Sequence, residues 1–214
     1  MKINITPSVT ALPDVVRQAK VDEGGFGKYF TDHMVIANWH VDSGWGDAEL
    51  KAYGPLSLDP ATMVLHYGQE IFEGLKAYWQ PDNSISLFRP DANGKRFAKS
   101  AKRLALPELP VAAFIETIET LVKQDKGWVP HKVGSSLYIR PFMIATEVAI
   151  GVRPSKSASY ILIACPVGAY FSTTTAVTVW ISTEYVRASL GGTGEAKCGG
   201  NYAASLLAQQ QAAA

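Results

Sequence analysis

The chain has 214 residues and 47% of them are hydrophobic, so it is long and apolar enough to bury a substantial core, and disorder is not expected. With a formal net charge of +1 and 18% charged residues, it lacks the basic excess that nucleic acid or acidic membranes require, and a small-molecule ligand is favoured. No apolar run approaches the roughly 20 residues that cross a bilayer, and the first residues lack the apolar core of a secretion signal. The two cysteines lie far apart in the sequence with no metal-type pairing nearby, which favours a reducing cytosol over an oxidising compartment. We therefore expect a soluble, cytoplasmic protein.

The first half of the chain predicts strands after an irregular start. Residues 1–30 mix proline, glycine and charge with little periodicity, and we expect them to lie over the surface of the remainder. A strand-like pattern begins in FTDHMVIANWHV, residues 30–41. The stretch GLKAYWQPDNSISLFRP, residues 74–90, predicts a hairpin because β-rich runs flank a turn-forming Pro-Asp-Asn.

Helices and strands then mix. Apolar residues at helical spacing predict helices over 95–106 and 112–125. Dense β-branched and aromatic runs predict strands over 136–145, 159–167 and 176–183. Because there is no strict βαβ rhythm, the predicted class is α/β (α+β), an open mixed sheet with helices packed to one side.

Small polar residues suggest a domain boundary late in the chain. We predict an N-terminal domain over 1–170, a connection over 171–176, and the beginning of a second domain over 177–214. A good helix former over 201–214 ends without a capping residue, so we expect the 214 residues to be part of a longer protein.

The stretch GGTGEAKCGGNY sets Lys197 among five glycines. A phosphate-cradling loop needs glycine before the lysine and Ser or Thr after it, whereas Ala196 and Cys198 stand there. A dinucleotide-binding turn needs a third glycine where Lys197 follows Gly192 and Gly194. Two interpretations remain: a lysine used for its amine, or a surface turn without a task.

Other candidate residues have ordinary structural interpretations. Strand alternation places Tyr138 and Arg140 on one face, which is typical of a polar sheet face. Arg96 is typical of a solvated helix charge, and His66 of a hydrogen-bonded structural histidine. Three aromatic residues are by default part of the core: Tyr67, Phe72 and Tyr170. We find no metal-binding cluster and no Ser-His-Asp arrangement.

Together, several motifs resemble one family. LHYGQEIFEGLKAY, LYIRPF, CPVGAYF and GGTGEAKCGGNYAASLLAQ occur in the order seen in branched-chain amino acid aminotransferases. The similarity extends to FGKYFTDHMV and RPDANGKRFAKSAKRLALPELP, and so covers nearly the whole chain. These enzymes belong to fold-type IV, whose members use pyridoxal 5'-phosphate. The resemblance implies a small N-terminal α/β domain followed by the start of the larger cofactor-binding domain.

The resemblance implies roles for four residues around the cofactor. Lys197 would bond the cofactor aldehyde and then act as acid and base. Arg96 would hold the phosphate, which replaces the solvated-charge interpretation. Tyr202 would hydrogen-bond the phenolic oxygen of the cofactor, and Arg187 would tune that network.

The resemblance also implies a substrate pocket and a partner. The pocket residues would be Phe26, Tyr67, Phe72, Tyr138, Arg140, Val152 and Tyr170. The loop with Gly151 and Val152 would reach into the neighbouring subunit of a homodimer, and Tyr67 would act across the same interface. No metal, nucleic acid or membrane is implied.

The implied reaction transfers the amino group of leucine, isoleucine or valine to 2-oxoglutarate. One alternative is another fold-type IV enzyme, such as a D-amino acid aminotransferase or aminodeoxychorismate lyase. A second is a non-catalytic module that binds a phosphorylated ligand. Relatives continue beyond residue 214, where the acid that bonds the cofactor ring nitrogen lies, so we expect the 214 residues alone to be inactive.

Overall fold

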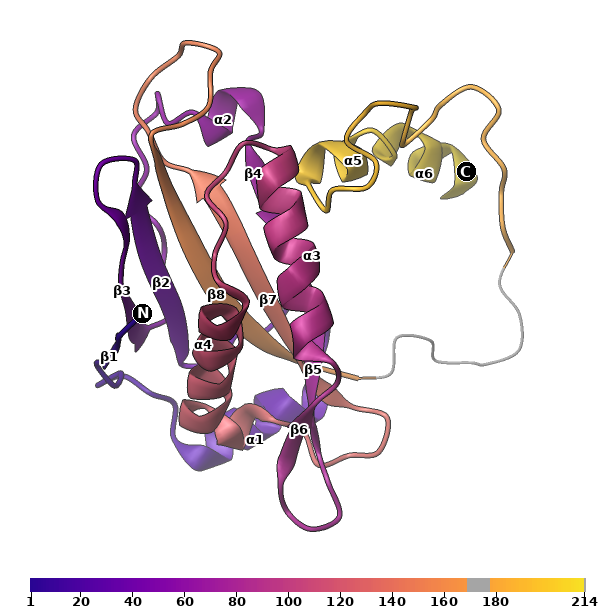
Figure 1. Ribbon diagram of the computed structural model, residues 1–214. Helices are drawn as coiled ribbons and strands as arrows, with labels where there is room; N and C mark the ends of the chain where they lie inside the picture. Colours follow the sequence, from indigo (N-terminus) through magenta and orange to yellow (C-terminus); the bar gives the residue numbers. More distant parts are fainter. Residues whose placement is uncertain (169–177, 214) are drawn as a thin grey trace.

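The computed structural model describes residues 1–168 and 178–213, which form a curled mixed sheet with helices around it (Figure 1). The strands are β1 (Ile3–Ile5), β2 (His33–His40), β3 (Gly44–Ala52), β4 (Glu70–Phe72), β5 (Leu75–Trp79), β6 (Ile85–Leu87), β7 (Ser136–Ala145) and β8 (Ser157–Val167). The helices are α1 (Asp14–Glu23), α2 (Val64–Tyr67), α3 (Pro90–Arg103), α4 (Val111–Gln124), the 3₁₀ turn η1 (Lys126–Trp128), α5 (Gly199–Ala203) and α6 (Leu206–Ala213). The α/β class with an open mixed sheet is confirmed.

The eight strands form one sheet in the order β1-β3-β2-β8-β7-β5-β6, with β4 also paired to β7. β1 runs parallel to β3, and the other pairs are antiparallel. The β7–β8 ladder extends from Ser136 opposite Val167 to Ala145 opposite Ala158. Because β7 also pairs with β4 and β5, its side chains lie at the centre of the sheet.

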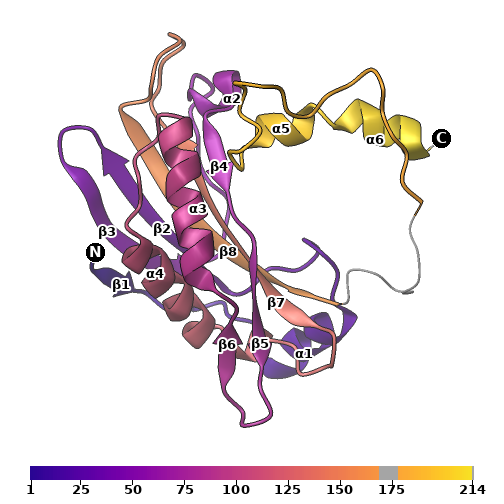
Figure 2. The ribbon, with the colours of Figure 1, turned by 45° about the vertical axis from the view of Figure 1, so that its right-hand side comes forward.

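Helices α3 and α4 cover one face of the sheet (Figures 1 and 2). Pro90 begins α3, where its fixed φ favours a first helical turn. The ring centroids of Phe97 in α3 and Phe114 in α4 lie 5.4 Å apart, and that of Tyr160 in β8 lies 5.8 Å from Phe97. A Cβ at Gly94 would lie 3.0 Å from a Val111 methyl, so glycine allows the two helices to approach closely. These contacts form the core beneath α3.

Most of the elements predicted from the sequence are present. The strand over 136–145 coincides with β7, the 74–90 hairpin corresponds to β5 and β6, and the helix over 112–125 corresponds to α4. The predicted helix over 95–106 is α3, which begins earlier, at Pro90. The first thirty residues are more regular than expected, because they contain β1 and α1. No described helix is both long enough and apolar enough to span a membrane.

Near the C-terminal end one prediction is wrong and a second is confirmed only in part. Residues 178–183, the described part of the strand predicted over 176–183, form no strand. Val179 and Ile181 are 75% and 79% exposed, and no described strand pairs with this stretch. Its β-prone residues therefore have no neighbouring strand with which to form backbone hydrogen bonds. The predicted helix over 201–214 is interrupted between α5 and α6, where Ser205 Oγ donates a hydrogen bond to Tyr202 O, 2.7 Å away.

The predicted connection over 171–176 and the candidate residue Tyr170 lie outside the described residues.

Candidate active site

The backbone around Lys197 is bonded to two distant elements. Lys197 N donates a hydrogen bond to Ser100 Oγ of α3 at 3.0 Å, and Phe72 N at the end of β4 donates one to Lys197 O at 2.9 Å. Gly199 N donates to the carboxylate of Glu70, also on β4. The lysine therefore stands where α3, β4 and the start of α5 meet.

The glycine-rich stretch around Lys197 is an ordered turn. Asn201 is 3% exposed, and its Nδ2 donates to Thr193 O at 2.8 Å and to Ala196 O at 2.7 Å. Thr193 Oγ1 returns a hydrogen bond to Asn201 Oδ1 at 2.8 Å. The Arg103 guanidinium also donates to the carbonyls of Gly191 and Gly192. The loop is therefore held in place by hydrogen bonds from Asn201 and Arg103, which favours a lysine in a fixed position.

The Lys197 amine lies among three of the predicted site residues. Lys197 Nζ donates to Tyr202 Oη at 2.8 Å and lies 4.7 Å from the centre of the Phe72 ring. The Phe72 and Tyr202 rings are 4.9 Å apart. Arg187 Cζ lies 6.0 Å from the Tyr202 ring, so its cation is adjacent to the same phenol. The amine therefore has a polar partner on one side and an aromatic wall on the other.

Arg96 is held by a buried carboxylate. Its Nε and Nη2 donate to the two oxygens of Glu73 at 2.5 and 2.8 Å, and Glu73 is fully buried. Asn93 Nδ2 donates to the same carboxylate at 2.8 Å. The hydrogen bonds between Arg96 and Glu73 raise the pKa of Arg96, and the nearby Tyr202 phenol adds a smaller effect. Because the Arg96 side chain is 53% exposed, the opposite edge of its guanidinium is available to a ligand.

A second group of predicted residues continues from Phe72 across the sheet. Arg140 Cζ lies 4.6 Å from the Phe72 ring, and Arg140 Nη2 donates to Tyr138 Oη at 2.9 Å. Tyr138 and Arg140 share one face of β7, as alternation predicts. The Phe26 and Tyr138 rings are 4.9 Å apart. A side chain at Gly74 would collide with the Tyr138 phenol, which explains why glycine stands there.

Hollows adjoin this second group. One, of about 600 Å³, is lined by residues that include Phe26, Lys76 and Tyr138. A smaller one, of about 120 Å³, lies against Phe26, Tyr138, Arg140 and Cys165. Burial raises the pKa of the Cys165 thiol, so this cysteine is an apolar part of the wall. The combination of aromatic walls and one guanidinium suits a ligand with an apolar body and an anionic end.

Tyr67 is bonded to the loop that carries Val152. Tyr67 Oη donates a hydrogen bond to Ile150 O, which ties α2 to the 147–153 loop. Val152 on that loop is 85% exposed, and Ile150 and Val148 are 68% and 59% exposed. Within the described residues, no hydrogen bond or ion pair joins this loop to Lys197. His66 Nε2 lies 2.9 Å from Pro60 O, as expected for a structural histidine.

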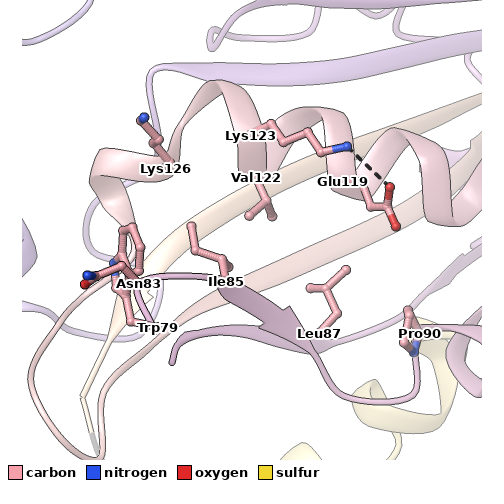
Figure 3. Close-up of a pocket in the computed structure, with 9 residues that line it drawn as sticks. All are labelled: Trp79, Asn83, Ile85, Leu87, Pro90, Glu119, Val122, Lys123 and Lys126. Atoms are coloured by element: carbon pink, nitrogen blue, oxygen red, sulfur yellow. Dashed lines mark ion pairs between the residues drawn. The ribbon is translucent and has the colours of Figure 1, made fainter. Parts of the chain in front are cut away.

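Another hollow, of about 780 Å³, lies between the β5–β6 hairpin and α4 (Figure 3). Trp79, Ile85, Leu87 and Val122 form its apolar lining, with Lys123 paired to Glu119 at 3.6 Å on its rim. It contains none of the predicted site residues, and the hairpin and α5 lie at opposite ends of the molecule (Figures 1 and 2). We therefore place the candidate site at Lys197. Among the described residues, no cluster of His, Cys, Asp and Glu has the arrangement of a metal site.

Sequence patterns did not point to three polar residues of the site. Ser100, Glu70 and Glu73 each contact a residue far away in the chain, which one-dimensional patterns do not reveal. Glu70 lies in a partly buried position, and this burial raises the pKa of its carboxyl group. The one available signal was a pair of glutamates in the apolar run EIFEGL, because acids are rarely buried without a partner.

Curated relatives identify the family. A Streptomyces coelicolor protein named a probable branched-chain-amino-acid aminotransferase is 58% identical over 214 residues, covering 99% of this chain and 59% of the relative. The branched-chain-amino-acid transaminase 1 of Bacillus subtilis is 47% identical over 190 residues, covering 88% of this chain and 53% of the relative. This chain therefore spans little more than half the length of these relatives. No family model matches it.

Solved structures agree with the curated relatives. A T.th. branched-chain amino acid aminotransferase, solved with pyridoxamine 5'-phosphate, has a TM-score of 0.60 and 25% identity, covering 82% of this chain and 55% of that one. A Thermoproteus uzoniensis branched-chain aminotransferase with norvaline has a TM-score of 0.62 over 83% of this chain and 56% of that one, and at 22% identity it supports the fold alone. The chain belongs to the branched-chain amino acid aminotransferase family.

Proposed function

We propose that the protein containing this chain uses pyridoxal 5'-phosphate to transfer the amino group of leucine, isoleucine or valine to 2-oxoglutarate. The observation that carries this proposal is the Lys197 amine, which is tethered at its backbone and lies 2.8 Å from the Tyr202 phenol. The close relatives named as branched-chain-amino-acid aminotransferases support the substrate class. When bound, the cofactor supplies the electron sink for chemistry at the substrate α-carbon.

The residues present fit such a cofactor at both of its ends. Arg96 offers the free edge of a guanidinium that is fixed by Glu73, and a planar pair of donors suits phosphate oxygens. Tyr202 offers a phenol beside the lysine for the cofactor's phenolic oxygen, with Arg187 behind it. Lys197 Nζ would be the amine that condenses with the cofactor aldehyde, with release of water. We propose that residues 177–214 begin the cofactor-binding domain.

Lys197 also serves as the proton carrier in this proposal. Once released from the cofactor, Lys197 Nζ would carry the proton between the substrate α-carbon and cofactor C4'. Its tethered backbone favours this second role, because the amine stays near the reacting carbon after release. Tyr202 Oη remains within hydrogen-bond reach and orients Nζ.

The substrate pocket is assigned to the residues that continue from Phe72. Phe26, Phe72 and Tyr138 line an apolar chamber for the branched side chain, and Arg140 organises its polar edge. We assign Tyr170 to the same pocket from the sequence alone. Tyr67 and Val152 complete the neighbouring subunit's pocket in a cytoplasmic homodimer, and the exposure of the 147–153 loop supports that assignment. Sedimentation of a monomer at micromolar concentration would contradict the dimer.

Mapping of the covalent site tests the central proposal. The protein is incubated with pyridoxal phosphate, reduced with borohydride, digested and analysed by mass spectrometry. We expect a phosphopyridoxyl group on Lys197, and none in a Lys197→Ala variant. An unlabelled Lys197 in folded wild-type protein would refute the mechanism and favour a non-catalytic module. A panel of L-branched, D- and aromatic amino acids then distinguishes the proposed reaction from those of other fold-type IV enzymes.

A further inference from the structure

The backbone of Lys197 is held by a side chain that has no part in the proposed chemistry. Ser100 Oγ accepts a hydrogen bond from Lys197 N at 3.0 Å, across 97 positions of sequence. Ser100 is 1% exposed. A hydroxyl so deeply buried lies in the core side of α3 and cannot contact a ligand that binds at the Lys197 amine.

Ser100 also stands one helical turn after Arg96 on α3. Residues four apart in an α-helix lie about 6 Å apart along its axis and on the same side. One rigid helix therefore carries both the guanidinium assigned to the phosphate and the acceptor that holds the lysine backbone. We propose that Ser100 is a positioning residue that fixes the Lys197 amine at a set distance from the Arg96 guanidinium. This inference rests on the proposed function, in which the two groups hold opposite ends of one cofactor.

The composition of the loop explains why such a link is needed. Five glycines surround Lys197, and glycine leaves a backbone many accessible conformations. Asn201 closes the loop by bonding Thr193 and Ala196, but those hydrogen bonds join the loop only to itself. Arg103 and Lys99 of α3 bond Gly191, Gly192 and Glu195 earlier in the loop, but Ser100 is the α3 side chain that bonds the Lys197 backbone itself, and Phe72 N joins Lys197 O to β4. A reacting group displaced by about 1 Å loses on the order of a hundredfold in rate, so the position of the tether matters.

A Ser100→Ala variant removes the acceptor, and Thr117→Val is the matched control. Thr117 is also a fully buried hydroxyl on a neighbouring helix, and it bonds Phe114 O and the Tyr160 hydroxyl rather than the lysine loop. Two probes separate the two ends of the site. Pyridoxamine 5'-phosphate has no aldehyde and reports non-covalent binding, whereas borohydride trapping of pyridoxal 5'-phosphate reports capture by Lys197.

In Ser100→Ala we expect covalent capture to slow by about tenfold, while the Kd for pyridoxamine 5'-phosphate stays within about twofold. In the cofactor-free protein, the Lys197 amide should exchange its hydrogen about tenfold faster. Thr117→Val should leave all three quantities unchanged. Ser100→Cys keeps a similar volume with a weaker acceptor, so it should change capture and exchange in the same direction but less.

Unchanged covalent capture and unchanged amide exchange in Ser100→Ala would overturn the proposal. An equal weakening of pyridoxamine 5'-phosphate binding and of covalent capture would also overturn it, because it indicates a general loss of structure. If Ser100→Ala does not fold, wild-type capture by Ser100→Cys overturns it instead. The exchange measurement separates this inference from the proposed function. A wild-type protein that traps no cofactor on Lys197 refutes the function, while faster amide exchange in the variant still supports the tether.

Discussion

The most consequential single residue outside the predicted set is Glu73. It is fully buried, and Arg96 supplies two of its hydrogen bonds. Arg96→Met would leave the carboxylate without its cation, and we expect the free energy of unfolding to fall by about 3 kcal/mol. Adding Glu73→Gln should recover more than half of that loss, because the uncompensated charge is then gone. Urea unfolding of the variants measures both effects.

The control for the Arg96 and Glu73 variants is a substitution of another arginine that has a carboxylate partner. Arg153 is paired with Glu147 near the surface, so Arg153→Met should lower the free energy of unfolding less than Arg96→Met does. If Arg96→Met and Arg153→Met lowered the free energy of unfolding equally, the burial of Glu73 could not be the cause of the Arg96→Met effect.

At the residue scale, patterns that depend on near neighbours were predictable. The alternation of β7 placed Tyr138 and Arg140 together, and Arg140 Nη2 does donate to Tyr138 Oη. The partners of Lys197 were not predictable in this way, since Ser100 and Glu70 reach the loop only after the sheet and α3 have packed.

At the scale of elements, the Glu147 carboxylate accepts the hydrogen bonds that hold the loop between β7 and β8. Arg153 and the backbone N–H of Lys156 donate to Glu147, and the pKa of Glu147 is lowered from 4.5 to about 2. Since the folded-state pKa is depressed, this stabilisation is present above about pH 4.5 and is lost as the pH falls towards 2. NMR titration of the Glu147 side-chain carboxyl should give a midpoint near 2.

Arg153→Gln should move that midpoint upward, because the side-chain hydrogen bonds from Arg153 are the largest cause of the shift. A wild-type midpoint near 4.5 would show that the loop is not held in this way.

Prediction of whole elements depended on whether a partner element existed. β7, β8 and the β5–β6 hairpin were predictable because each β-prone run finds a ladder. Residues 178–183 have a similar composition but pair with no described strand, so propensity alone misled. β1 and α1 were missed because a three-residue strand and a helix with one buried residue leave almost no periodicity to detect.

At the scale of the whole molecule, the residues that the structure describes leave part of the proposed site exposed to solvent. Tyr202 is 40% exposed, and large apolar side chains between residues 179 and 190 are also exposed, including Val179, Ile181 and Leu190. The chain spans about 59% of the length of its Streptomyces relative, and a transaminating site must exclude water around the reacting carbon.

We therefore expect a purified 214-residue polypeptide, saturated with pyridoxal phosphate, to form no glutamate from leucine and 2-oxoglutarate beyond the level of its Lys197→Ala variant. Circular dichroism must show that both polypeptides are folded, because an unfolded chain would also be inactive. The physical reason is that the described residues supply the lysine, one phosphate ligand and one wall of the pocket, and leave Tyr202 beside the Lys197 amine 40% exposed. Lysine-dependent turnover by the 214 residues would show that this one wall is sufficient for catalysis.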